Sequence, residues 1–269
     1  MFWVTVLTFP NARMFQPFVL GCIFSHVPYR ERTATMSNEK RKRLTILTGS
    51  GMSAESGLAT FRDAGGLWEN YNVTDVASID GWERNPQLVT AFYNARRAQL
   101  AGAEPNDGHR GLAELEKSFT VRIITQNVDN LHERAGSPSV LHLHGKLTSA
   151  RCTGPERHTV DIGYRAMDLA ETCGAGHRLR PDIVWFGEEV PAMDEAVRLV
   201  ESADVFAIIG TSLAVYPAAS LIEWVPQGVP VFVIDPVPPN IYRANNITVI
   251  PMRAVEGVAA FAERIKRYL

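Results

Sequence analysis

Short runs of apolar, mostly β-branched residues recur along the chain, and each is long enough for one strand. The first run, residues 44–48, ends directly at Gly49. Continuous apolar runs of this length, bounded by turn residues, are typical of parallel strands that are buried on both faces. The runs expected to form strands are residues 44–48, 121–125, 205–209, 229–234 and 247–250.

Helical patterns lie between and after these runs, at residues 86–100, 109–117, 193–201 and 255–269. Strands that alternate with helices predict an α/β fold with a doubly wound, parallel, Rossmann-like sheet. Ligands of such folds bind at the carboxyl ends of the strands. We therefore look for chemistry in the segments that follow each predicted strand.

Two stretches depart from this alternation. Residues 54–100 are long for a single connection, so we expect a helical excursion over the sheet edge. Residues 150–180 are polar and contain several glycines without a strand-like run, so we expect a small inserted module. The expected parts of a single domain, residues 36–269, are a core of about 43–53, 101–149 and 181–269, the excursion of about 54–100 and the module of about 150–180.

Residues 1–35 differ from the rest of the chain. They are apolar and aromatic but are broken by Pro10, Arg13 and Pro17, so they lack the run of about 20 apolar residues that a membrane span needs. They also lack the basic start and the cleavage site of a signal peptide. Because Met36 opens an ordinary N-terminal sequence, we interpret residues 1–35 as an over-extended start or a disordered leader; a targeting segment is the alternative.

The composition is that of an ordinary globular protein, with 46% hydrophobic and 21% charged residues. A formal net charge of -2 provides no excess of cations for binding nucleic acid. The three cysteines, Cys22, Cys152 and Cys173, do not form a disulfide framework in a chain of this size. We expect a cytoplasmic monomer without nucleic-acid or membrane partners.

A glycine-rich turn, residues 49–57, follows the first predicted strand. Glycines let the backbone approach a pyrophosphate, and the N–H groups of a following helix can bind the anion. The pair Gly49 and Gly51 is weak evidence alone, since any tight turn could contain it. The third glycine of a dehydrogenase fingerprint would fall at Ala54, which disfavours an ordinary dehydrogenase.

Polar residues follow the second predicted strand. Asn127 and Asp129 offer an amide and a carboxylate, which suit a carboxamide and ribose hydroxyls. A lone histidine is more often structural, but His144 lies on a glycine-flanked loop near the same sheet edge, which favours a functional role. The motifs considered together are residues 60–62 (Thr-Phe-Arg), 125–132 (Thr-Gln-Asn-Val-Asp-Asn-Leu-His) and 143–145 (Leu-His-Gly).

Together these motifs resemble those of the sirtuin family. Residues 49–62 are similar to the sirtuin element G-A-G-x-S-x-x-S-G-I-P-D-F-R, with Ser50 for alanine and Ala59-Thr60 for Pro-Asp. Residues 125–132 match T-Q-N-I-D-x-L-H. The further matches are His144-Gly145 to the catalytic H-G, residues 184–188 to V-V-W-F-G-E, the nucleotide-binding residues 210–212, and Asp235-Pro236, where many sirtuins carry asparagine first. The resemblance runs from about Arg43 to the C-terminus.

The resemblance implies an NAD-dependent protein-lysine deacylase. In sirtuins the acyl-lysine carbonyl oxygen attacks C1′ of the nicotinamide ribose, nicotinamide leaves, and O-acyl-ADP-ribose is formed. His144 would be the general base, acting through the ribose hydroxyls, and Asn127 and Asp129 would hold nicotinamide and its ribose. Arg62 and the glycine turn would bind the phosphates. The residues implied to bind NAD are Gly49, Ser50, Gly51, Met52, Ser53, Thr60, Phe61, Arg62, Trp68, Gln126, Asn127, Val128, Asp129, Gly210, Thr211, Ser212, Asp235, Pro236, Val237 and Ala254.

Two residues on one predicted helix indicate which acyl groups the substrate carries. Tyr93 and Arg96 are three residues apart and share a helix face. On the pattern alone, the tyrosine would pack in the core and the arginine would reach water. The pair also resembles the Y-x-x-R signature of class III sirtuins, which binds the carboxylate of succinyl- or malonyl-lysine and so implies activity on these groups as well as on acetyl. The residues implied to bind substrate are Tyr93, Arg96, the small Ala77, Val184, Phe186, Gly187 and Glu188.

Sirtuins usually hold zinc with two C-x-x-C pairs, and here each pair lacks a member. Cys152 and Cys173 remain as the expected ligands, while Pro155 and Gly176 occupy the other positions. His158 and His177 could complete a Cys2His2 set. The alternative is a module that folds without metal.

Two other functions are compatible with the same NAD site. A mono-ADP-ribosyltransferase would use a different acceptor, and the pair Tyr93 and Arg96 favours deacylation over it. A non-catalytic NAD-binding regulator would not need the base His144. Release of O-acyl-ADP-ribose from an acyl peptide discriminates among the three.

Overall fold

Six parallel strands form the central sheet, and they include all five of the predicted strands. In the computed structural model, which describes residues 41–269 except 60–66, 69–70 and 242–245, the strand order is β11-β10-β9-β1-β4-β5. Every neighbouring pair is parallel. The strands are β1 (Arg43–Thr48), β4 (Thr120–Thr125), β5 (Val140–His142), β9 (Val205–Ile209), β10 (Val231–Ile234) and β11 (Ile247–Ile250). The short edge strand β5 was not predicted.

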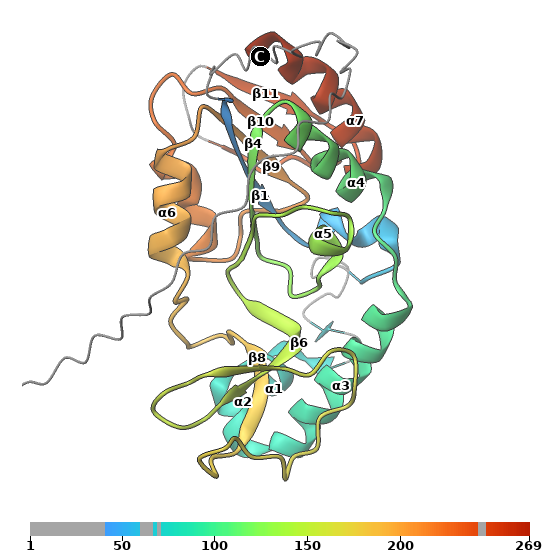
Figure 1. The fold of residues 1–269 in the computed structure, drawn as a ribbon, viewed down its shortest axis with the longest axis vertical. Helices are drawn as coiled ribbons and strands as arrows, with labels where there is room; N and C mark the ends of the chain where they lie inside the picture. Colours follow the sequence, from blue (N-terminus) through green and yellow to red (C-terminus); the bar gives the residue numbers. More distant parts are fainter. Residues whose placement is uncertain (1–40, 60–66, 69–70, 242–245) are drawn as a thin grey trace, which may run out of the picture. The chain divides into compact units, whose positions relative to one another are not determined.

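Helices cover both faces of this sheet (Figure 1). On one face, α4 (Asp107–Glu114) and α7 (Ala254–Ile265) pack in a buried cluster that contains Leu112, Phe232 and Phe261. On the other face, α6 (Met193–Glu201) contributes Val200 to a cluster with Phe206. The doubly wound α/β fold expected from the sequence is confirmed. No helix among the described residues has the length and apolarity that a membrane crossing requires.

The excursion contains α1 (Val73–Val76), α2 (Ile79–Arg84) and α3 (Pro86–Gly102), together with a short hairpin of β2 (Leu67–Trp68) and β3 (Tyr71–Asn72). Helix α3 begins where Asn85 accepts a hydrogen bond from the Leu88 N–H at 3.0 Å and Pro86 occupies the first turn. The side chains of Val89 and Phe92 are buried in a cluster with Leu147 and Ile183. This cluster joins the excursion to the second sheet.

The second sheet is antiparallel, in the order β7-β6-β8. Its strands are β6 (Gly145–Cys152), β7 (Thr159–Asp161) and β8 (Leu179–Ile183). The sequence indicated no strand at residues 150–180, and on this point the structure differs. All three residues of β7 are exposed, and β6 and β8 lie largely outside that stretch, so no apolar run marks them.

The strand order reverses at β1. From there the chain builds β4 and β5 on one side, and β9, β10 and β11 on the other. The carboxyl ends of β1, β4 and β9 therefore meet at a topological switch point, where open α/β sheets bind their ligands. The leader, residues 1–35, lies outside the described residues.

Two neutral imidazoles are buried against each other near this sheet. The rings of His109 and His132 are 0% and 1% exposed, and their centroids lie 4.9 Å apart. His109 Nδ1 accepts a hydrogen bond from the Asn106 N–H at 3.3 Å, and His132 Nε2 lies 3.1 Å from Thr48 Oγ1. Burial lowers the pKa of His109 to about 4 and that of His132 to about 3.

Acid should therefore destabilise the fold through this pair. Between about pH 6.5, the ordinary value for imidazole, and pH 4, the unfolded chain binds protons that the folded chain cannot bind, so stability falls as the pH falls. By pH 4.5 the loss should be roughly 2–3 kcal/mol for each imidazole. Urea unfolding at pH 7.0, 5.5 and 4.5 measures it. The variant His109→Gln should be less stable at pH 7 yet lose less on acidification, and an unchanged slope would contradict this account.

Candidate functional site

A cavity of about 550 Å³ lies at the switch point. Segments that follow β1, β4, β9 and β10 line it, together with residues of α3 and residues that follow β8. The predicted site residues that line the cavity are Gly49, Ser50, Gly51, Ser53, Ala77, Tyr93, Arg96, Gln126, Asn127, Val128, Asp129, His144, Val184, Phe186, Gly187, Glu188, Gly210, Thr211, Ser212, Asp235, Pro236, Val237 and Ala254.

Glycines bring two loops of this cavity into backbone contact. The Gly51 N–H donates to the Gly210 carbonyl at 2.9 Å. A Cβ atom on Gly51 would lie 2.7 Å from Gly210 Cα, and one on Gly210, whose φ is +63°, would lie 2.4 Å from Met52 N. Only glycine fits at either position. A tight turn of glycine backbone without side chains is of the kind that a dinucleotide-binding site requires.

The segment after β1 differs from the expected helix N-terminus. Residues Ser50–Met52 and Ala54–Ser56 form two short 3₁₀ turns. The side chain of Met52 is fully buried in the core and does not line the cavity, so Met52 contributes only its backbone to this turn.

Four predicted NAD residues cannot be located at the level of side chains. Thr60, Phe61 and Arg62 lie outside the described residues. Trp68 belongs to the hairpin strand β2, of which only the backbone is described.

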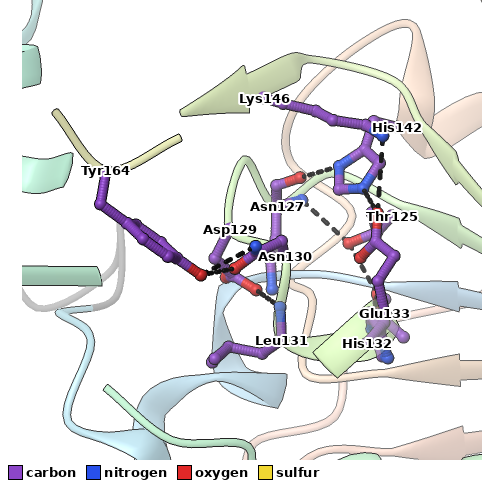
Figure 2. A network of polar contacts seen from close by, with 11 residues as sticks. Thr125, Asn127, Asp129, Asn130, Leu131, His132, Glu133, His142, Lys146 and Tyr164 are labelled. Atoms are coloured by element: carbon purple, nitrogen blue, oxygen red, sulfur yellow. Dashed lines mark hydrogen bonds and ion pairs between the residues drawn. The ribbon is translucent and has the colours of Figure 1, made fainter. Parts of the chain in front are cut away.

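Asn127 and Asp129 are connected through Ser53. The Asn127 amide nitrogen donates to the Gly49 carbonyl and to Ser53 Oγ, both at 3.1 Å. The Ser53 hydroxyl donates to Asp129 Oδ2 at 2.9 Å. The Leu131 N–H donates to Asp129 Oδ1 at 3.1 Å (Figure 2). Burial raises the pKa of Asp129, and these hydrogen bonds oppose the rise. The amide and the carboxylate are therefore fixed in the cavity wall.

His144 follows β5 and is oriented by the same loop. Its Nδ1 atom lies 3.0 Å from the Gln126 carbonyl oxygen. Because a carbonyl oxygen only accepts, Nδ1 carries the proton, and Nε2 keeps a lone pair when the ring is neutral. Burial lowers the pKa of His144, and the hydrogen bond to Gln126 partly offsets this effect. The ring can therefore act as a base near neutral pH.

The loops after β4 and β9 are connected by Gln126. Its side-chain amide donates to Thr211 Oγ1 at 3.0 Å, and the Leu213 N–H donates to the same oxygen at 3.2 Å. The Asp235 carboxylate is mostly buried and accepts from the Val237 N–H at 2.8 Å. Asp235 therefore shapes the turn after β10.

Tyr93 and Arg96 lie on α3 and both line the cavity. The Trp185 indole N–H donates to the Tyr93 hydroxyl oxygen at 3.0 Å, so the hydroxyl proton can be donated elsewhere. Burial raises the pKa of Tyr93, which keeps the phenol protonated. Ala77, whose carbonyl accepts from the Phe186 N–H at 2.9 Å, places no large side chain in this part of the cavity.

Glu188 lines the cavity, but its carboxylate is paired. Arg180 donates to its two oxygens at 2.7 and 2.8 Å, and the Trp185 N–H donates at 2.9 Å. The Arg180 guanidinium also lies 3.5 Å from the centroid of the Trp185 ring. Trp185 and Arg180 were not predicted as site residues; Trp185 stands within the motif at residues 184–188, whereas no sequence signal marked Arg180.

A cluster of candidate metal ligands lies in the antiparallel module. The ligand atoms of Cys152, His158 and Cys173 lie within 4.8 Å of one another, and the two sulfur atoms are 3.0 Å apart. His177 Nδ1 is 3.9 Å from Cys173 Sγ. Two thiolates and an imidazole, with a second imidazole nearby, fit a tetrahedral zinc ion.

Comparisons with known proteins agree with this geometry. Residues 49–217 match the Sir2 family. A Bacteroides thetaiotaomicron protein named NAD-dependent protein deacylase is 52% identical over 241 residues, which cover 85% of this chain and 98% of that protein. An Escherichia coli (strain K12) protein of the same name is 46% identical over 202 residues, covering 72% of this chain and 71% of that protein.

A solved complex of a Sir2 homologue with NAD is 37% identical, with a TM-score of 0.75, and covers 85% of this chain and 91% of that chain. The Sir2 family match covers residues 49–217, and the relative at 52% identity is covered almost completely. Together these two findings establish the family as well as the fold. The chain belongs to the Sir2 family, the sirtuins.

Proposed function

We propose that this chain is an NAD-dependent protein-lysine deacylase that removes succinyl and malonyl groups as well as acetyl. One observation carries the proposal: a neutral histidine oriented by the Gln126 carbonyl lines the same cavity as Asn127 and Asp129, at the switch point of a Sir2-family sheet. The names of the relatives, NAD-dependent protein deacylase, support it.

Each of these residues has a distinct task in the proposed reaction. NAD supplies the ribose carbon that accepts the acyl oxygen when nicotinamide departs. The Asn127 amide and the Asp129 carboxylate hold the nicotinamide and its ribose, and His144 Nε2 takes a proton from the ribose hydroxyls. The loops around Gly51 and Gly210 line the same cavity, and we place the phosphates against their backbone.

The acidic acyl groups are assigned to Tyr93 and Arg96. A guanidinium and a phenol that donates its proton form charge-assisted and neutral hydrogen bonds with a carboxylate. Because Glu188 is paired with Arg180, we assign Glu188 a structural role in the cavity wall. Arg96 is the residue that we assign to the carboxylate of the substrate.

We further propose that the module binds one zinc ion through Cys152, His158 and Cys173, with His177 as the fourth ligand. The ion would stabilise the module, since structural zinc adds its binding energy to folding. A cytoplasmic, monomeric enzyme whose leader, residues 1–35, is dispensable also remains our proposal.

Replacement of His144 by alanine should lower deacylation by about 100-fold or more, because a general base contributes about that much. NAD affinity should stay within a few fold, since the imidazole is a base and not an anchor. In the wild type, the rise of kcat/KM with pH should have its midpoint below about pH 6.5, the ordinary value for imidazole, because burial lowers the pKa of His144. Release of O-acyl-ADP-ribose measures the rate; an alanine variant with unchanged turnover would exclude this role.

The variant Arg96→Met should reduce kcat/KM for a succinyl-lysine peptide by about 10- to 150-fold, the value of charge-assisted hydrogen bonds. The acetyl-lysine peptide should lose much less, since it has no carboxylate. Tyr93→Phe should act in the same direction but more weakly.

The neighbouring Arg97 provides a matched control for this pair. It is fully buried, and its side chain donates to the Leu147 carbonyl and to the Asn94 amide oxygen, both at 2.6 Å. Arg97→Met should lower stability and impair both substrates equally. If Arg96→Met showed equal losses on both substrates, a plain deacetylase would replace the acidic-acyl proposal.

Metal analysis of the purified protein should find about one zinc per chain. Cys173→Ser should lose the metal and lower the melting temperature, whereas Asp168→Asn, in the same module but outside the cluster, should retain it. A stoichiometry near zero in the wild type would show that the module folds without metal.

A further inference from the structure

Two histidines separated by one residue bind successive carbonyl groups of residues 126–129, hereafter the 126–129 loop. His144 Nδ1 lies 3.0 Å from the Gln126 carbonyl oxygen, and His142 Nδ1 lies 3.0 Å from that of Asn127. His142 is the last residue of β5, so its ring is carried by the main sheet. Figure 2 shows the His142 ring between the loop and α5 (Leu131–Arg134).

The second nitrogen of His142 distinguishes it from His144. His142 Nε2 lies 2.8 Å from Glu133 Oε1, and the His142 side chain is 3% exposed. Burial raises the pKa of Glu133, but the hydrogen bond and charge of His142, with the charge of Lys146, lower it to about 2. A carbonyl oxygen and an ionised carboxylate can only accept hydrogen bonds. Both ring nitrogens of His142 must therefore donate, which only an imidazolium can do.

We propose that His142, held as an imidazolium by Glu133, is a positioning residue that fixes the Asn127 carbonyl and thereby orients the 126–129 loop for NAD. The role rests on the proposed function, because the loop carries the groups assigned to nicotinamide and its ribose. His142 acts through this loop and does not itself line the cavity.

The surroundings of His142 show which charges accompany it. Glu133 on α5 contacts it, and Lys146 Nζ on β6 lies 3.6 Å from the same Glu133 oxygen. The charge of His142 lowers the pKa of Asp129 in the loop and of Asp182 on β8. It also lowers the pKa of His132, a neutral ring on α5. For Asp129, the positive charge opposes the effect of burial and favours the ionised carboxylate. The pair thus supports both the geometry and the charge of the loop.

The protonation state can be tested directly by ¹⁵N NMR of protein labelled in histidine, at pH 7.5. We expect both ring nitrogens of His142 to be protonated, while only Nδ1 of His144 is protonated. His142→Asn removes the signal and so assigns it, and Glu133→Gln should convert His142 to a neutral ring. A neutral His142 in the wild type would overturn the inference, whatever the activity.

The positioning role is tested by kinetics with an acetyl-lysine peptide. In His142→Asn, kcat/KM for NAD should fall by about 10-fold or more, the value of one hydrogen bond to a charged group. Glu133→Gln keeps the shape of the pair, and its activity relative to the wild type should decline as the pH rises from 6 to 8. The matched control Lys146→Gln removes the other cation near Glu133 without touching the loop, and should keep the wild-type rate and pH profile.

The outcomes separate this inference from the proposed function. If His142→Asn does not fold, Glu133→Gln decides alone through its pH profile and its NMR signal. Wild-type kcat/KM and an unchanged profile in Glu133→Gln would overturn the positioning role.

A wild type that deacylates no acyl-lysine peptide would instead overturn the proposed function. The role of His142 and Glu133 would then be tested by the affinity for NAD, measured by calorimetry. We expect weaker binding of NAD in both variants, and unchanged binding would overturn the positioning role.

Discussion

The backbone contact between Gly51 and Gly210 is the constraint on which the site depends. The strand order reverses at β1, so the loops after β1 and β9 leave the sheet side by side. They approach to a hydrogen bond of 2.9 Å because neither carries a side chain at the contact. A larger residue at either position would push the loops apart and move Ser53, and with it the hydrogen bonds to Asn127 and Asp129. The geometry of the proposed site thus depends on a contact that involves none of the residues to which chemistry is assigned.

Buried polar groups at the base of the 126–129 loop are hydrogen-bonded to one another. The Thr48 hydroxyl donates to Thr125 Oγ1 at 2.8 Å, and the Asn127 N–H donates to the same oxygen at 3.0 Å. Thr48 and Thr125 are directly paired in neighbouring strands, so the sheet register itself sets the start of the loop. Buried polar groups that lack partners are costly. The network satisfies these groups with protein partners, and it fixes the start of the loop to the sheet.

The sequence predicted those features that depend on local pattern. Apolar runs revealed β1, β4, β9, β10 and β11, because strands buried on both faces need such runs. They could not reveal β5, which is three residues long, or β7, which is exposed. The motifs identified many of the residues that line the cavity, but not their partners.

Contacts between residues of different structural elements explain what the sequence did not predict. Glu188 stands in a motif, yet its pairing with Arg180 depends on how β8 meets the following turn. The ring nitrogens of His142 contact the Asn127 carbonyl and Glu133. A sequence pattern does not reveal that a backbone carbonyl will be the acceptor. Met52 shows the opposite case: it stands within a motif predicted to bind NAD, but its side chain is buried in the hydrophobic core.

Buried arginines lie on and near α3 and differ in their partners. Arg180 is balanced by the Glu188 carboxylate, whereas Arg97 donates to two neutral oxygens. Burial lowers the pKa of Arg97 to about 10, which leaves it charged at neutral pH. Arg96, on the same helix, lines the cavity, whereas Arg97 does not. Under the proposed function, a carboxylate at the end of an acyl group would lie near the Arg96 guanidinium and form charge-assisted hydrogen bonds with it, whereas an acetyl group has no carboxylate to do so. This difference is the physical basis of the proposal that acidic acyl groups are accepted as well as acetyl.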